Sequence, residues 1–131
     1  NTLTKTNEMK LSTFSAIWAF LYIGFGLGLL IIPEKFMSTY GVSLDSGGAM
    51  MARILGAALT AYALSFWMNR ESPISDQSWK NLLTVSVIYN ILDIPIVLMA
   101  TLNGVMNSMG WMPVGLHVFL ATTMAYFVFR K

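Results

Sequence analysis

The sequence predicts an all-α protein: an antiparallel four-helix transmembrane bundle with a short interfacial helix after the first span. The chain has 131 residues, of which 56% are hydrophobic and only 11% charged, whereas about 25% of residues are charged in typical soluble domains. A soluble domain of this size could not bury so much apolar surface. Four apolar segments are long enough to cross a bilayer, since about 20 helical residues match its hydrocarbon core. Within a single domain over residues 1–131, these spans are Phe14–Ile32, Ala49–Met68, Leu82–Leu102 and Trp111–Phe129.

Composition and motifs exclude several functions. The chain contains no cysteine, which rules out disulfides, thiolate metal sites and cysteine nucleophiles. Its net charge of +2 is too small and too dispersed to indicate a nucleic-acid partner. The sequence has no paired carboxylates, glycine-rich phosphate loop or Ser/His/Asp arrangement. We therefore expect no autonomous enzyme, while a subunit that lends one residue to a shared membrane site stays open. We expect no cofactor other than, at most, a bound lipid or quinone.

The first span follows a polar segment, residues 1–11, which we expect to be frayed. Ser12 or Thr13 is the predicted N-cap of the first helix, because hydroxyl side chains accept from its free backbone N–H groups. Gly24 and Gly28 lie four residues apart, with Gly26 between them, a spacing that lets two helices approach closely in lipid. Glycine is also frequent in membrane helices generally, so a packing role for this pair is one of two interpretations.

A short interfacial helix is predicted to begin at Pro33-Glu34, because proline and glutamate are both favoured in a first helical turn. Gly41 is the predicted stop signal after it, and Asp45 or Ser46 the predicted N-cap of the second span. We expect three apolar side chains of this segment to face the membrane, namely Phe36, Met37 and Tyr40.

The second span carries an arginine and several small residues on one helix face, a pattern that predicts packing against another helix. A polar connection, Asn69–Lys80, leads to the third span, whose predicted N-cap is Ser75 or Asp76. On the second span, the helix face with the arginine and the small residues consists of Arg53, Gly56, Ala57, Thr60 and Ala61.

The third span contains Asp93 deep in an apolar run, where an ionisable side chain needs a partner, a proton or water. Asn90 shares its helix face and Tyr89 borders that face. At 1.5 Å per residue, Arg53 lies about 5 Å, His117 about 9 Å and Asp93 about 13 Å below the outer ends of their spans. We therefore predict an Arg53–Asp93 ion pair inside the bundle, with Asn90 and His117 as neighbours.

Simpler interpretations of these residues stay open. Arg53 is shallow enough to reach the outer headgroups instead. Asp93 could be a neutral acid bonded to a backbone carbonyl, and His117 an ordinary buried histidine.

Lysine and arginine residues outside the spans predict the orientation. Six lie on the side of the termini, whereas only Lys35 lies on the other side. Both termini are therefore expected in the cytoplasm, with a bacterial inner membrane as the expected location. The six are Lys5, Lys10, Arg70, Lys80, Arg130 and Lys131.

Three stretches, Leu30–Phe36, the loop to Asp45, and Ala52–Gly56, resemble small four-helix membrane proteins of the DoxX-like family. The resemblance covers most of the chain and implies an antiparallel four-helix bundle with an outer arginine at the start of the second helix. Some members accompany quinone-linked oxidoreductases or help to assemble other membrane proteins. The cysteines of some members are missing here, so thiol chemistry is not implied.

The first functional hypothesis is a non-catalytic accessory subunit or assembly partner of a larger membrane complex, or a homo-oligomer, motivated by small size and small-residue faces. The second is a binding module for a lipid or quinone-like amphiphile at an outer-half polar site. In that case Arg53 would meet the head of the ligand, and an apolar slot would be lined by Tyr22, Tyr62 and Tyr89.

Two further hypotheses involve protons or metal. Asp93 and His117 could support proton-coupled transport, because both can change protonation inside the membrane. Thioethers select Cu(I), and three methionines repeat every third residue at the outer surface, although methionine is also a common packing residue. The candidate extracytoplasmic Cu(I) ligands are Met106, Met109 and Met112.

Overall fold

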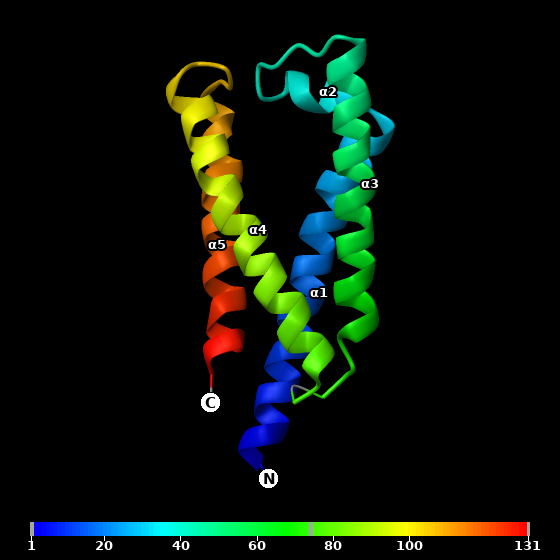
Figure 1. Cartoon of the computed structure of the whole chain (residues 1–131), viewed down its shortest axis with the longest axis vertical. Coiled ribbons are helices and arrows are strands. Elements are labelled where there is room, and N and C mark those ends of the chain that lie inside the picture. Colours follow the sequence, from blue (N-terminus) through cyan, green and yellow to red (C-terminus); the bar gives the residue numbers. More distant parts are fainter. Residues whose placement is uncertain (1, 74, 131) are drawn as a thin grey trace.

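The computed structural model describes residues 2–73 and 75–130, with position 4 described by its backbone only. The described ranges are helical and contain no strand, and four of their helices are long and apolar enough to cross a membrane. These four pack against one another, which confirms the predicted four-helix bundle (Figure 1). In chain order the elements are α1 (Thr2–Ile31), α2 (Pro33–Ser38), α3 (Ser46–Asn69), α4 (Gln77–Leu102), the short 3₁₀ helix η1 (Ser108–Gly110) and α5 (Trp111–Phe129).

Helix α1 begins well before the apolar span. It starts at Thr2 rather than at the predicted cap, Ser12 or Thr13, so the expected cap and the frayed segment before it are wrong. The Ser15 hydroxyl donates a hydrogen bond to the Phe66 carbonyl of α3, 2.6 Å away. The helix is thus anchored to the bundle from Leu11 onward, which is only 1% exposed, and the polar residues before it continue the same helix.

The short helix α2 lies where the sequence predicts it, but its apolar face points inward. Tyr40, just after the helix, is only 4% exposed. The Phe36 ring packs edge-on against Phe25 of α1, with centroids 5.4 Å apart, and occupies the space that a side chain at Gly28 would fill. The expectation of a membrane-facing segment is therefore wrong for three residues that instead line a cavity: Phe36, Met37 and Tyr40.

Aspartate side chains cap the two central helices, as predicted. The Asp45 carboxylate accepts from the Gly48 backbone N–H at 2.7 Å at the start of α3. The Asp76 carboxylate accepts from the Ser78 N–H at 3.0 Å at the start of α4. Gly41 adopts a φ of 77°, which other residues rarely adopt, and this allows the chain to turn after α2.

Helices α1 and α3 form a close pair through two glycines. A Cβ atom added at Gly56 would lie 2.6 Å from the Gly26 carbonyl oxygen, and one added at Gly26 would lie 2.8 Å from the Thr60 backbone nitrogen. The small face predicted on α3 does pack against a helix at these positions. On α1, however, the contact uses Gly26 and not Gly24, around which a Cβ would meet nothing within 4 Å.

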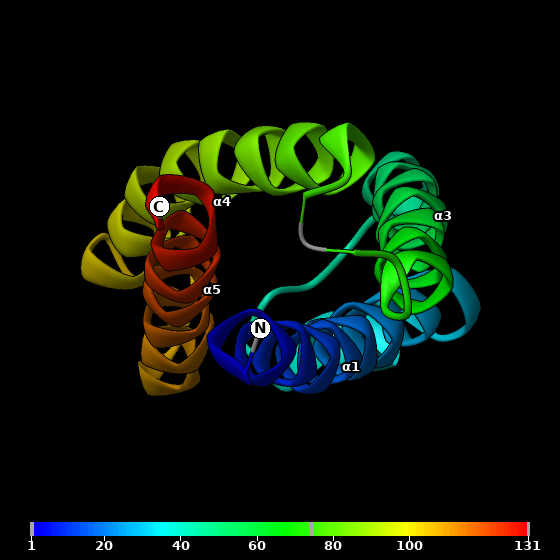
Figure 2. The ribbon, with the colours of Figure 1, turned by 90° about the horizontal axis from the view of Figure 1, so that it is seen from below.

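The bundle consists of two helix pairs, α1 with α3 and α4 with α5 (Figure 2). Helix α4 runs obliquely from the end of α3 to the start of α5 (Figure 1). An aromatic core joins the pairs at the end where both termini lie. The Trp18 ring packs edge-on against Phe66 of α3 and Phe127 of α5, at 5.5 and 5.8 Å, and its indole N–H donates to Thr123 at 3.1 Å.

A loop contact ties the pairs together at the opposite end. Asn107 follows α4, and its backbone N–H donates to the Tyr40 carbonyl at 2.8 Å. Its side-chain amide donates to the Thr39 carbonyl at 3.1 Å. We call these two hydrogen bonds the Asn107 clasp. Between the clasp and the aromatic core, the helix pairs enclose the space that holds the candidate site.

Candidate functional site

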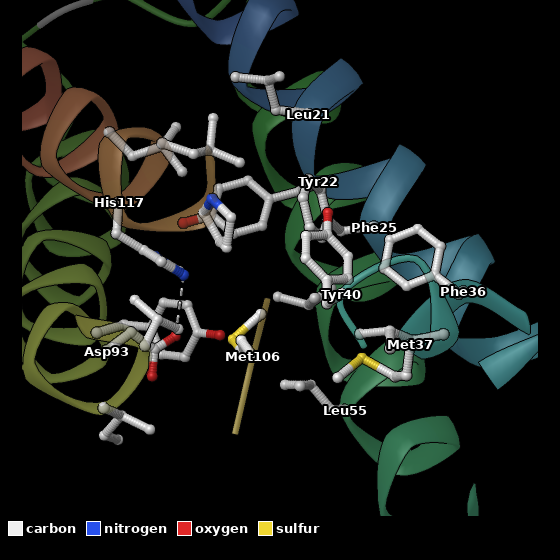
Figure 3. Close-up of a pocket in the computed structure, with 18 residues that line it drawn as sticks. Leu21, Tyr22, Phe25, Phe36, Met37, Tyr40, Leu55, Asp93, Met106 and His117 are labelled. Atoms are coloured by element: carbon white, nitrogen blue, oxygen red, sulfur yellow. Dashed lines mark ion pairs between the residues drawn. The ribbon is translucent and has the colours of Figure 1, made fainter. Parts of the chain in front are cut away.

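The candidate site is a cavity of about 240 Å³ between the two helix pairs. Side chains from α1 to α5 contribute to its lining, and most of them are aliphatic or aromatic (Figure 3). A cavity of this kind, mostly apolar with a few convergent polar groups, is typical of small-molecule sites. The polar side chains in its wall are Tyr22, Tyr40, Tyr89, Asp93 and His117.

Asp93 of α4 and His117 of α5 lie side by side in this wall (Figure 3). The His117 Nε2 atom is 3.7 Å from the nearer Asp93 carboxylate oxygen. The His117 side chain is 16% exposed and the Asp93 side chain 24% exposed, so both can be reached from the cavity. The structure thus brings together the acid and the histidine that the sequence predicts as neighbours.

Arg53 does not pair with Asp93, and the predicted ion pair is wrong. Its guanidinium lies 3.8 Å from the Glu34 carboxylate of α2, with both side chains about half exposed at 46% and 56%. Lying in the same outer half of the bundle does not place two side chains on facing sides of their helices. Arg53 is absent from the cavity wall, so it is not the group that would meet a ligand there.

Asn90 links His117 to the buried core of the bundle through hydrogen bonds. Its amide nitrogen donates to the Ser86 carbonyl at 2.8 Å and to the Tyr22 hydroxyl at 2.9 Å. Its amide oxygen lies 2.8 Å from His117 Nδ1. Because the Ser86 carbonyl can only accept, the amide nitrogen must face it, and the amide oxygen must face the imidazole.

This orientation assigns the protons of His117. The Asn90 oxygen accepts, so His117 Nδ1 carries a hydrogen and donates it. In the neutral ring Nε2 is then the unprotonated nitrogen, and it faces Asp93. The Tyr22 hydroxyl accepts from Asn90 and keeps its own hydrogen to donate.

Tyrosine rings form one side of the site. Tyr89 meets the His117 ring edge-on at 6.3 Å and stacks on Tyr62 at 5.8 Å, and Tyr62 stacks on Tyr22 at 5.5 Å. Tyr22 and Tyr89 line the cavity, as the sequence suggests, whereas Tyr62 supports them from behind. The stack keeps both lining tyrosines in fixed positions.

Sequence reasoning missed two parts of the site. The first is the wall from α1 beyond the predicted Tyr22, whose signal is the helical spacing of Phe25 and Leu29 on the same face as Tyr22. The second is the wall from α2, which was expected to face lipid. Glu34 was likewise missed as the partner of Arg53.

The three methionines proposed as Cu(I) ligands differ in their surroundings. Met106 is buried and lines the cavity, whereas Met109 and Met112 are each 45% exposed. The Cu(I) hypothesis therefore gains no support from their placement and stays a prediction.

Comparisons with protein-family models, curated proteins and solved structures found no match. The fold and the site define a class on their own: an all-helical chain with four helices able to cross a membrane and a largely apolar cavity between them. The resemblance to the DoxX-like family stays a proposal.

Proposed function

We propose that this integral membrane protein binds an amphiphile in the cavity, with the small polar head of the ligand at Asp93 and His117. The observation that carries the proposal is the cavity itself, about 240 Å³ of mostly apolar space with an acid and a histidine in its wall. An apolar tail fits the aliphatic and aromatic lining, and the head satisfies polar groups that are expensive to leave unpaired inside a membrane.

The rim of the cavity supports access from the lipid. Leu55 of α3 and Ile96 of α4 line the cavity and are also 42% and 64% exposed on the outside of the bundle. Both are large apolar residues, as expected where a wall meets lipid. A membrane-dissolved ligand could therefore enter between α3 and α4 without first passing through water.

The orientation with both termini in the cytoplasm belongs to the same proposal. The two termini lie at one end of the bundle (Figure 1), and most of the basic residues outside the spans belong to that end, which the positive-inside rule assigns to the cytoplasm. The cavity then lies toward the outer face of what we take to be a bacterial inner membrane.

Two other hypotheses keep the status of predictions. The accessory-subunit hypothesis was motivated by small residues, but Gly26 and Gly56 are used inside this chain, where they bring α1 and α3 together. Copurification of a partner protein in mild detergent would test that hypothesis. Proton-coupled transport would use the same acid and histidine, and loss of transport in Asp93→Asn would test that.

The amphiphile proposal is tested by filling the cavity. Val97 of α4 lines it, so Val97→Phe should occupy space that the ligand needs. We expect mass spectrometry of the protein purified in mild detergent to find a copurifying amphiphile, reduced about tenfold in this variant. Binding of a decyl-substituted benzoquinone should fall by a similar factor.

The matched control is Val118→Phe, because Val118 of α5 is 47% exposed on the outside of the bundle. It adds the same ring to a lipid-facing surface and should leave retention unchanged. Equal retention in both variants, with both folded, would contradict the proposal.

A further inference from the structure

The cavity has an unbalanced set of charges. Asp93 is the one acid among the residues described in its wall, and none of them is a lysine or an arginine. Arg53, the predicted partner of Asp93, pairs instead with Glu34 and does not belong to the wall. An anionic head would therefore meet a carboxylate with no fixed positive charge to offset it, which disfavours anionic ligands.

His117 does not complete a hydrogen-bonded pair with the acid. Its Nε2 atom lies 3.7 Å from the carboxylate, beyond the range of about 2.7–3.2 Å for N–H···O hydrogen bonds. Its Nδ1 hydrogen is given to Asn90. The Tyr89 hydroxyl, from the same helix, does donate a hydrogen bond to Asp93. Because a carboxylate has about four acceptor positions, Asp93 still keeps free ones where it lines the cavity and a group of the ligand can approach.

Aromatic rings surround the remaining space. Tyr22 and Phe25 of α1 and Phe36 and Tyr40 near α2 line the cavity (Figure 3). Tyr89 of α4 lines it as well. The faces of aromatic rings attract cations, most strongly where water is excluded. A carboxylate combined with several rings is the chemistry that recognises an alkylated ammonium group.

Resting on the proposed function, we infer that the head of the amphiphile is a monovalent cation, an alkylammonium or similar group, whose charge is neutralised by Asp93. The apolar tail then lies along the aliphatic lining toward Leu55 and Ile96. A neutral head of the same size fits the space but leaves the carboxylate with no counter-charge other than a protonated His117, 3.7 Å away.

Two probes that each carry a twelve-carbon alkyl chain test this inference in lipid nanodiscs, with empty nanodiscs as the blank. Dodecyltrimethylammonium carries the cation, and dodecanol has the same chain length and no charge. We expect the wild-type protein to bind the cation about tenfold more tightly than dodecanol. Asp93→Asn has nearly the same shape and should abolish this preference, whereas Asp93→Glu keeps the charge and should retain it.

The outcomes separate this inference from the proposed function. Equal affinities in the wild-type protein, or a preference that persists in Asp93→Asn, would overturn the cationic head. If Val97→Phe still weakened both probes, the cavity would remain an amphiphile site with a neutral head. Binding of neither probe above the blank would overturn both.

Discussion

Asn90 determines how the polar groups of the cavity are oriented. It is fully buried, and its amide is shared between the Ser86 carbonyl, the Tyr22 hydroxyl and His117. Each of these bonds uses a group that would otherwise lack a partner in a low-dielectric interior. The residue therefore supports the site without belonging to the cavity wall.

Removing this amide should destabilise the bundle. In Asn90→Leu, the Nδ1–H group of His117 and the Tyr22 hydroxyl lose their partner, which costs about 2 kcal/mol of the free energy of unfolding. Denaturation of the purified protein in detergent measures the change. Ser86→Ala is the control, because the Ser86 hydroxyl bonds only within its own helix, to the Leu82 carbonyl; a comparable loss there would contradict the argument.

The residues of the site were predictable where one helix relates them and, in one case, across two helices. Asn90 and Asp93 lie three positions apart in the sequence, so their common face follows from helical periodicity. The meeting with His117 followed from depth, because both spans are antiparallel neighbours. The same reasoning gave a wrong partner for Arg53, because the depth of a residue in the membrane does not say in which direction its side chain points. Glu34 is its partner because α2 folds back beside α3.

At the scale of helices, close packing of α1 on α3 depends on Gly56. Even a methyl group there would lie 2.5 Å from the Leu30 backbone nitrogen, so Gly56→Ala forces the helices apart. We expect a loss of about 1–3 kcal/mol in the free energy of unfolding, seen as a lower melting temperature in detergent. Gly24→Ala meets no atom within 4 Å and should be neutral or slightly stabilising. The reverse order of the two variants would refute this packing.

Helix ends differed in how well the sequence predicts them. The caps Asp45 and Asp76 were predictable, because an aspartate before a helix accepts from backbone N–H groups of the first turn. The start of α1 was not, because the helix already begins at Thr2 and runs unbroken through the predicted cap at Ser12 or Thr13. The inward face of α2 depends on the space left by Gly28, which no local pattern reveals.

For the whole molecule, the proposed orientation can be checked because the chain has no cysteine. Ser43, in the connection between α2 and α3, and Ser75, between α3 and α4, are both exposed and lie on opposite sides in the proposed topology. In intact cells a membrane-impermeant maleimide should label Ser43→Cys at once. Ser75→Cys should react only after the cells are opened. The opposite pattern would invert the topology.

The Asn107 clasp has a consequence for affinity. The helix pairs are held at one end by aromatic packing and at the other by two loop hydrogen bonds. The cavity between them is therefore already formed in the absence of a ligand, and binding does not require the helices to move apart. Little conformational freedom is lost on binding, so complementarity of shape and charge would decide which molecules stay.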